Sequence, residues 1–420
     1  MEAIVIQGQS RLQGRVSISG SKNAVLPVIA ACLLTEEECL FDDIPRLTDV
    51  DTMCDVIGEL GASVSPHGVK GLRIKSGSLK NIEPSYEYVR RMRASFLVMG
   101  PLLARFGRVK VYLPGGCAIG ARPIDLHLKG MAAMGAEISV NNGKVEAVAK
   151  KRLKGTSIYL DFPSVGATEN IMMAAALAEG TTVIENAAGE PEIVDLANFI
   201  NAMGGRVTGA GTRVVKIEGV EELHGHRHSV IPDRVEAGTF MIAAAATGGD
   251  VLIENVIPHH LKAVMAKLAE AGVQMVEEDG GIRVKADLPL NAVDIKTLPY
   301  PGFPTDMQAQ FMSLLTSAKG SSMVTETVFE NRFMHVNELK RMGANIVIEG
   351  HCAVVKGQKK LTGAPVKATD LRAGAALVIA GLMAEGKTTI SCIHHIDRGY
   401  EDIVGKLSHL GAKITRQEVE

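Results

Sequence analysis

The sequence is short of the features that mark membrane and secreted proteins. Its longest apolar stretches, residues 94–104 and 373–384, fall well below the ~20 residues needed to cross a bilayer. The first residues, MEAIVIQGQSRLQG, contain neither a basic flank nor a continuous apolar segment, so we expect no signal peptide. The six cysteines form no CxxC pair and no disulfide-like rhythm. Together these absences favour a reduced, cytoplasmic location.

The sequence also lacks an excess of charge of either sign. Its 45 lysines and arginines nearly balance its 47 acidic residues, which leaves a net charge of −2. Binding to nucleic acid usually requires a strongly basic face, so we expect no nucleic-acid partner. His224, His226 and His228 alternate, but no cysteine or carboxylate follows them at a ligand spacing. We therefore expect no metal site.

What the sequence does contain is an internal repeat. One signature, a helix end followed by a glycine, a small residue and a strand, recurs six times. Its glycines are Gly61, Gly135, Gly204, Gly272, Gly343 and Gly411, at intervals of 74, 69, 68, 71 and 68 residues. The expected helices show apolar residues at helical spacing, as in residues 193–203, and the strands are β-branched, as in residues 181–184. A unit of ~70 residues buries too little surface to be stable alone. We predict an α/β fold of two domains with three units each, formed by residues 22–229 and by residues 1–21 with 230–420.

The loops of the repeats are the first candidates for function. They follow equivalent strands yet differ from one another, and a repeat that keeps its scaffold but varies its loops usually carries function there. Cys117 lies in the loop at residues 114–123, among three glycines that allow a backbone to approach a ligand closely. Arg122 and His127 would stabilise its thiolate. Simple core packing remains the alternative for this cysteine.

Cationic side chains and one carboxylate form the second group of candidates. Arg90, Arg91 and Arg93 are predicted to open the helix that enters residues 94–104, and Arg122, Arg332, Arg372 and Arg398 are predicted at loops or helix starts. Guanidinium groups bind carboxylate and phosphate with two hydrogen bonds, although a solvated surface charge is the alternative for each. Lys22 precedes a helix whose N–H groups would help it to hold an anion. Asp306, behind Pro304, is predicted at a helix N-cap, and capping is its alternative role.

One apparent motif is rejected. Residues 381–388, GLMAEGKT, match the phosphate-loop pattern, but that pattern requires a strand before the loop and a helix after it. Here an apolar helix is expected before it and a strand after it. We therefore expect no ATP site.

Eight segments, spread in order over the chain, resemble one enzyme family. They are SGSKNAVLP, RRMRASF, LPGGCAIGARPIDLH, SVGAT, PGFPTDMQAQF, ETVFENRFMHV, ATDLRAGAAL and HIDRGYE. The sequence resembles the UDP-N-acetylglucosamine 1-carboxyvinyltransferases, which carry out the first committed step of peptidoglycan synthesis. The resemblance implies two inside-out α/β domains of three repeats each, an active site in the cleft between them, and an N-terminal strand that returns to the second domain.

The resemblance also implies roles for individual residues. Lys22, Asn23, Arg93, Arg122 and Arg398 would bind phosphoenolpyruvate and its departing phosphate, with Lys22 and Arg398 taking part in catalysis. Cys117 would be a general acid that can attach covalently to the substrate, and Asp306 would accept the proton of the sugar hydroxyl. The matching nucleotide-sugar positions are Arg122, Pro123, Ile124, Asp125, Leu126, Ser164, Val165, Gly166, Asp306 and Val328, and Arg332, Asp370 and Arg372 complete the implied substrate contacts.

The implied partners are phosphoenolpyruvate and UDP-N-acetylglucosamine, with no cofactor and no obligate protein partner. This chain departs from some members at Phe162-Pro163, where they carry a lysine two residues before the serine, and Phe162 is therefore not assigned as a ligand. Two alternatives stay open. One is an enzyme like 5-enolpyruvylshikimate-3-phosphate synthase, which shares the fold and chemistry. The other is a non-catalytic repeat scaffold for protein partners.

Overall fold

The computed structural model of the chain describes residues 2–114, 120, 124–358 and 360–418. The chain divides into two compact units. Of the described residues, the first unit comprises 20–114 and 124–231, and the second combines residues 2–19, Gly120 and residues 232–418. The chain passes from one unit to the other between Ser19 and Gly20 and again between Ile231 and Pro232.

The first unit contains three sheets among its described residues. Their strand orders are β13-β3-β5-β4, β6-β8-β7 and β11-β12-β10-β9. The strands are β3 (Glu38–Asp42), β4 (Ser63–His67), β5 (Gly71–Lys75), β6 (Arg108–Tyr112), β7 (Glu137–Asn141), β8 (Lys144–Val148), β9 (Ser157–Tyr159), β10 (Thr181–Glu185), β11 (Arg206–Thr208), β12 (Val214–Glu218) and β13 (Arg227–Ser229). The helices are α1 (Lys22–Ala31), η1 (Cys32–Leu34), α2 (Thr48–Leu60), α3 (Tyr86–Arg91), η2 (Arg93–Val98), α4 (Met99–Phe106), α5 (Asp125–Ala133), α6 (Val165–Ala176) and α7 (Pro191–Ala202), where η marks a 3₁₀ helix.

The second unit likewise contains three sheets in the part of the chain that is described. Their orders are β21-β22-β1-β23, β15-β16-β14-β2 and β17-β18-β20-β19. The strands are β1 (Glu2–Gln7), β2 (Gln13–Ser17), β14 (Asp250–Glu254), β15 (Gln274–Glu278), β16 (Gly281–Lys285), β17 (Ile295–Lys296), β18 (Ser321–Thr325), β19 (Asn345–Glu349), β20 (Cys352–Lys356), β21 (Pro365–Lys367), β22 (Lys387–Ser391) and β23 (Lys413–Glu418). The helices are α8 (Arg234–Ala246), η3 (Pro258–Leu261), α9 (Lys262–Glu270), η4 (Thr305–Met307), α10 (Gln308–Leu315), α11 (His335–Arg341), α12 (Leu371–Met383), α13 (His394–Asp397) and α14 (Ile403–His409).

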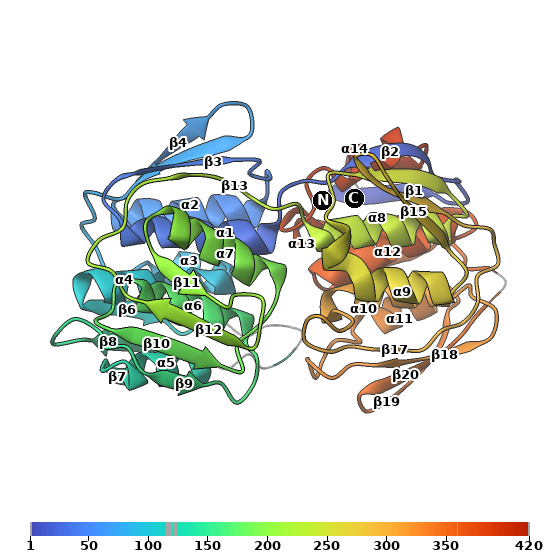
Figure 1. Cartoon of the computed structure of the whole chain (residues 1–420). Coiled ribbons are helices and arrows are strands. Elements are labelled where there is room, and N and C mark those ends of the chain that lie inside the picture. Colours follow the sequence, from blue (N-terminus) through green and yellow to red (C-terminus); the bar gives the residue numbers. More distant parts are fainter. Residues whose placement is uncertain (1, 115–119, 121–123, 359, 419–420) are drawn as a thin grey trace. The chain divides into compact units, whose positions relative to one another are not determined.

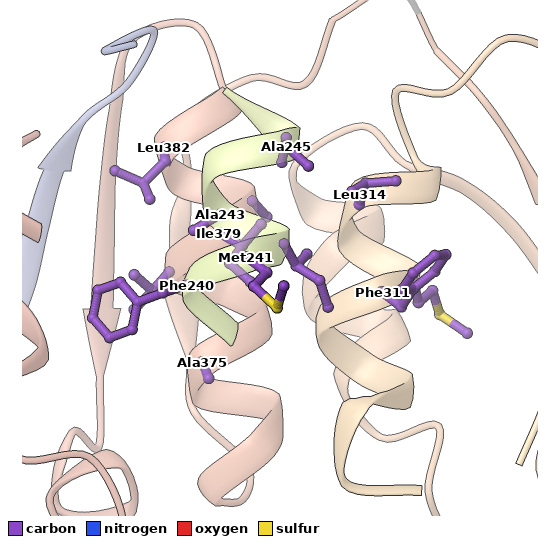
Figure 2. Close-up of a cluster of buried hydrophobic side chains, with 14 of the residues drawn as sticks. Phe240, Met241, Ala243, Ala245, Phe311, Leu314, Ala375, Ile379 and Leu382 are labelled. Carbon is purple, nitrogen blue, oxygen red and sulfur yellow. The ribbon is translucent and has the colours of Figure 1, made fainter. Parts of the chain in front are cut away.

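Apolar helices occupy the core of each unit. In the second unit, α10 is buried along its whole length and α8 and α12 along nearly all of theirs, so these helices have no polar face for solvent. Figure 2 shows their contact, where Phe240 and Met241 of α8, Phe311 of α10 and Ile379 of α12 lie in one cluster. The strands instead bury alternate residues, as β14 and β22 do, which is typical of a sheet with one solvated face. In Figure 1, strands β1 and β2 lie on one side of these helices and β17 to β20 on the other.

The six glycines of the repeat signature share one conformation. Each follows a helix, and their φ angles lie between 91° and 110°, a region that residues with a Cβ rarely adopt. Two hydrogen bonds recur at every copy, as at Gly61, where Gly61 N–H donates to Gly58 O and Ala62 N–H to Ile57 O. This is the Schellman ending of a helix, which satisfies carbonyls that the helix leaves unpaired. The predicted α/β architecture of six copies is thus confirmed, with three sheets in each unit.

The first strand of the chain belongs to the second unit. β1 lies in the middle of its sheet, antiparallel to both β22 and β23. β2 follows it and pairs in parallel with β14. Figure 1 shows the dark blue β1 among the red elements of the other end of the chain. The second unit is therefore closed by residues from both ends of the chain.

Candidate active site

Lys22 occupies the first turn of helix α1 in the first unit. Ser21 caps the helix, because its side chain accepts a hydrogen bond of 3.4 Å from the N–H of Ala24. The Lys22 ammonium lies 3.1 Å from a carboxylate oxygen of Asp49, and the two side chains are only 13% and 4% exposed. This ion pair fixes the lysine at a helix N-terminus, where backbone N–H groups also attract anions. Asn23 is half-buried beside it.

Two further helix starts carry the other candidates of the first unit. Ser164 caps α6 by accepting from the N–H of Ala167 at 3.3 Å, and Val165 and Gly166 form the first turn. That turn holds no acidic residue, so an anion placed there would meet no negative side chain within the turn. Three further nucleotide-sugar candidates lie at the start of α5, where Ile124 precedes the helix and Asp125 and Leu126 begin it.

Asn170 joins these segments and was not predicted. Its amide oxygen accepts from Gly100 N–H at 2.6 Å, and its amide nitrogen donates to Phe96 O at 3.1 Å and lies 3.1 Å from His127 Nδ1. Gly100 permits this packing, because a Cβ there would lie 2.3 Å from the backbone oxygen of Asn170. One buried side chain on α6 therefore fixes η2, α4 and α5 relative to one another. The only signal in the sequence is an asparagine inside an apolar helix, where it needs hydrogen-bond partners.

His127 does not have the role predicted for it. It is 7% exposed, packs edge-on against Phe96 at 5.3 Å and contacts Asn170. Burial, aided by the charge of Arg93, lowers the pKa of His127 to about 3. A neutral imidazole cannot stabilise a thiolate by charge. The expectation that His127 is a cationic neighbour of Cys117 is wrong, because desolvation costs the imidazolium too much.

The buried His127 predicts a loss of stability in mild acid. The unfolded chain takes up the proton below pH 6.5, whereas the folded chain does so only near pH 3. The contribution of His127 to the free energy of unfolding is thus fully present above pH 6.5 and is lost as the pH drops toward 3. The loss amounts to about 2 kcal/mol between pH 7 and pH 5. Urea unfolding at the two pH values should show that His127→Gln removes this part of the pH dependence. His226→Gln, at an exposed histidine of the same unit, should leave the pH dependence of the parent, and an equal effect of the two variants would contradict the assignment.

The three arginines near residue 90 do not open one helix. α3 ends at Arg91, Met92 has an extended backbone, and Arg93 begins the 3₁₀ helix η2 before α4 starts at Met99. Arg90 is an exposed surface residue that pairs with Glu87 at 3.1 Å, and Arg91 lies over the ring of Tyr88. Only Arg93 is half-buried and close enough to His127 to lower its pKa. The prediction of one helix is wrong because the extended backbone of Met92 interrupts it.

Asp306 is the centre of a charged cluster in the second unit. It lies inside the 3₁₀ turn η4, whose N-cap is Pro304, so the predicted N-cap position and capping role are wrong. Its two carboxylate oxygens instead accept from two arginines, Oδ1 from Arg332 Nη2 at 2.8 Å and Oδ2 from Arg372 Nη2 at 3.0 Å. The carboxylate is 28% exposed, whereas the arginine side chains are 3% and 5% exposed. The Asp306 carboxylate is therefore partly exposed, whereas the two arginines that bind it are buried.

A buried polar layer supports this cluster from behind. Arg372 lies over the ring of Tyr400 at 5.6 Å. Burial lowers the pKa of Arg372, but electrostatic interactions with Asp306, Tyr400 and Asp233 raise it by a larger amount. The pKa of Arg372 is therefore raised overall. Gln310 donates to the backbone oxygen of Asp306 at 2.8 Å and to Tyr400 at 3.3 Å. Burial has the opposite effect on the Tyr400 hydroxyl, whose pKa it raises. Neither Gln310 nor Tyr400 was predicted.

The remaining candidates of the second unit are Asp370, Val328 and Arg398. Asp370 caps α12 and accepts from Arg372 N–H at 2.9 Å. Val328 is half-buried in the turn after β18. Arg398 is half-buried and lies in the turn that follows α13, which agrees with its predicted place at a loop or helix start.

Three predicted residues, Cys117, Arg122 and Pro123, lie outside the described residues. The rejected phosphate loop is confirmed as a helix-to-strand turn, because α12 precedes it and β22 follows it. The described residues contain no cluster of three or more histidine, cysteine or acidic side chains arranged to hold a metal ion. In the same part of the chain, no helix combines the length and the apolar character needed to cross a bilayer.

The predicted residues that the structure describes fall into two groups, one in each unit. Lys22, Asn23, Arg93 and the starts of α5 and α6 make up the group in the first unit. Asp306, Arg332, Arg372, Asp370 and Val328 make up the group in the second. The first combines cations with helix N-termini, which suits phosphate groups. The second presents a carboxylate whose position is fixed by two arginines, which suits a general base.

Relatives of known name match the chain over almost its whole length. A protein of Caldanaerobacter subterraneus subsp. tengcongensis is 63% identical over 413 residues, covering 98% of this chain and 99% of the relative, and is named UDP-N-acetylglucosamine 1-carboxyvinyltransferase 1. A protein of Carboxydothermus hydrogenoformans is 61% identical over 418 residues, with 99% of both chains covered, and is named UDP-N-acetylglucosamine 1-carboxyvinyltransferase 2.

Solved structures and a family model agree with these relatives. The enolpyruvyl transferase NikO from Streptomyces tendae aligns with a TM-score of 0.90 at 25% identity, over 100% of this chain and 99% of that one. The EPSP synthase of Acinetobacter baumannii shares the fold, with a TM-score of 0.77 at 19% identity over 99% and 100% of the two chains. The family model described as EPSP synthase (3-phosphoshikimate 1-carboxyvinyltransferase) matches residues 6–407. The chain therefore belongs to the enolpyruvyl transferase family that this model describes.

Proposed function

We propose that this chain transfers the enolpyruvyl group of phosphoenolpyruvate to the 3′-hydroxyl of UDP-N-acetylglucosamine and releases phosphate. This is the first committed step of peptidoglycan precursor synthesis. The observation that carries the proposal is the identity of 61–63%, over 98–99% of this chain, to two proteins named for that transfer. The arrangement of Asp306 between two buried arginines supports it.

The proposed reaction begins with an addition. Asp306 accepts the proton of the sugar 3′-hydroxyl, whose oxygen attacks C2 of phosphoenolpyruvate, while an acid delivers a proton to the C3 methylene. By resemblance, Cys117 is that acid. The product is a tetrahedral ketal that carries phosphate and carboxylate. Loss of a proton from C3 then expels phosphate and restores the double bond, so atoms and charge balance.

The two groups of side chains suit the two substrates. Phosphoenolpyruvate is a dense anion that requires several fixed cations, and we assign Lys22, Arg93, Arg122 and Arg398 to it, with Asn23 beside them. The pair between Lys22 and Asp49 is only 3.1 Å long, and it would hold the ammonium in place before the substrate binds. The starts of α5 and α6, with Val328, Arg332, Asp370 and Arg372, are assigned to the nucleotide sugar. We place the reaction in the cytoplasm.

Phosphate release distinguishes the proposal from its two alternatives. We expect release from phosphoenolpyruvate to require UDP-N-acetylglucosamine, and shikimate 3-phosphate to support a rate lower by on the order of 10³-fold, since a site that hydrogen-bonds one substrate rejects another lacking those groups. Faster release with shikimate 3-phosphate would assign the chain to the activity of EPSP synthase. If no phosphate is released with either acceptor, the result would favour the non-catalytic scaffold.

A further inference from the structure

Glu326 follows strand β18 directly and is almost completely buried, with 1% of the residue exposed. Its two carboxylate oxygens accept four hydrogen bonds. Oε1 accepts from Thr297 Oγ1 at 2.8 Å, Val328 N at 2.9 Å and Phe329 N at 3.3 Å, and Oε2 accepts from Thr305 Oγ1 at 2.9 Å. Four donors match the acceptor sites of one carboxylate. The hydrogen-bonding capacity of the Glu326 carboxylate is therefore satisfied within the protein.

The four donors come from segments that carry proposed substrate residues. Thr305 immediately precedes Asp306 in the turn η4. Val328 is a proposed contact to the nucleotide sugar, and Phe329 follows it. Glu326 thus ties the segment that carries the proposed base to the segment that carries a proposed sugar contact, through hydrogen bonds alone.

The same network anchors both segments to the sheet. Thr327 N–H donates to Thr297 Oγ1 at 2.9 Å, and the Thr327 hydroxyl donates to Thr297 O at 2.6 Å. Thr297 directly follows β17, and the Glu326 N–H donates to His351 O at 2.8 Å. The turn of Val328 is therefore held from two sides, and Glu326 is the residue shared with the turn of Asp306.

We propose that Glu326 is a positioning residue for the transfer reaction. It sets the place of Asp306 through Thr305 and the place of Val328 through two backbone N–H groups, without touching a substrate. This inference rests on the proposed function, because the roles of Asp306 and Val328 come from it. The two kinds of residue have different roles: the arginines orient the Asp306 carboxylate, whereas Glu326 positions the backbone segment that carries it.

The test compares three variants that remove different parts of the network. Glu326→Ala removes the acceptor from all four donors. Glu326→Gln keeps an oxygen for the three donors at Oε1 and offers an N–H to the Thr305 hydroxyl, which can then accept. Thr305→Val removes only the link to the turn of Asp306. Thr182→Val is the matched control, because the Thr182 hydroxyl is equally buried but has no hydrogen-bond partner among the described residues.

We expect the variants to separate rate from binding. Glu326→Ala should lower kcat/KM on the order of 100-fold, the cost of a displacement of about 1 Å, and should also weaken binding of UDP-N-acetylglucosamine several-fold. Thr305→Val should lower kcat about 10-fold with the Kd of the nucleotide sugar within about twofold of the parent. Glu326→Gln and Thr182→Val should remain within about fivefold of the parent in kcat/KM, since both keep the hydrogen bonds that matter.

Hydrogen exchange gives a readout that does not depend on activity. The amides of Val328 and Phe329 should be protected in the parent, in Thr305→Val and in Thr182→Val, and should lose protection in Glu326→Ala. If Glu326→Ala does not fold, Thr305→Val and Glu326→Gln decide through the same split between kcat and Kd.

Two results would overturn the inference alone: an active parent whose Glu326→Ala variant keeps kcat/KM within about threefold, or a Thr305→Val variant that weakens sugar binding with kcat unchanged. A parent that releases no phosphate with UDP-N-acetylglucosamine would refute the proposed function, and the positioning role with it.

Discussion

Asp306→Asn is expected to lower the rate of enolpyruvyl transfer by about 10³-fold, within the range that a general base contributes. The amide has nearly the same shape but cannot accept the proton of the sugar hydroxyl. It can accept from only one of the two arginines that hold the carboxylate at 2.8 and 3.0 Å. Binding of the nucleotide sugar, spread over several contacts, should stay within about threefold, as expected when an interaction made only in the transition state is lost.

Stopped-flow or coupled phosphate assays measure the rate, and calorimetry measures binding. Asp250→Asn is the matched control, because Asp250 also pairs with an arginine at 2.8 Å and is 25% exposed, close to the 28% of Asp306. It should turn over at the parental rate. An Asp306→Asn variant that retains a tenth or more of parental turnover would show that Asp306 is not the base.

Arg372→Met is expected to lower kcat/KM about 100-fold or more, because the carboxylate loses one of the two donors that orient it. The substitution also removes the buried positive charge that pairs with Asp306. The carboxylates of Asp306 and Asp233 both raise the pKa of Arg372, so each stabilises its charge. Removing one partner of a buried ion pair costs about 3 kcal/mol or more. We therefore expect the thermal midpoint of the second unit to fall by roughly 6–12 °C.

Arg283→Met controls for loss of an arginine as such. Arg283 is 48% exposed and pairs with Asp250, and an exposed pair contributes only about 0–1 kcal/mol. Its loss should change neither the midpoint by more than about 3 °C nor the rate. Arg372→Met with the parental rate but a lowered midpoint would reduce Arg372 to a purely structural residue.

The repeat could be predicted from sequence because its signal is local. A glycine that must adopt positive φ after a helix, as Gly61 and Gly411 do at 110° and 93°, marks its position by residue type alone. The same holds for Ser21 and Ser164, whose capping roles depend on neighbours a few residues away. Local rules, repeated six times, were enough to predict the α/β fold and the number of its copies.

The candidate site depends on contacts that no local pattern encodes. Asp306 meets its arginines 26 and 66 residues later in the chain, so a reading of nearby residues assigned it a cap instead. His127 was read as a cation because its burial against Phe96 is a tertiary property. Glu326 gave no signal, since a glutamate after a strand usually faces solvent. Cys117 and Arg122 stay predictions that rest on the resemblance.

The placement of β1 has a consequence for how the protein is made. β1 is synthesised before its pairing partner β22, which follows about 380 residues later. At roughly 5–20 residues per second, the apolar segment Ala3–Ile6 waits about 20–80 s for that partner. The first unit, which lies entirely between residues 20 and 231, needs no such delay and is expected to fold on the ribosome. A nascent second unit therefore carries an unpaired β-strand throughout translation, and chaperones that bind short extended apolar segments are expected to protect its first residues.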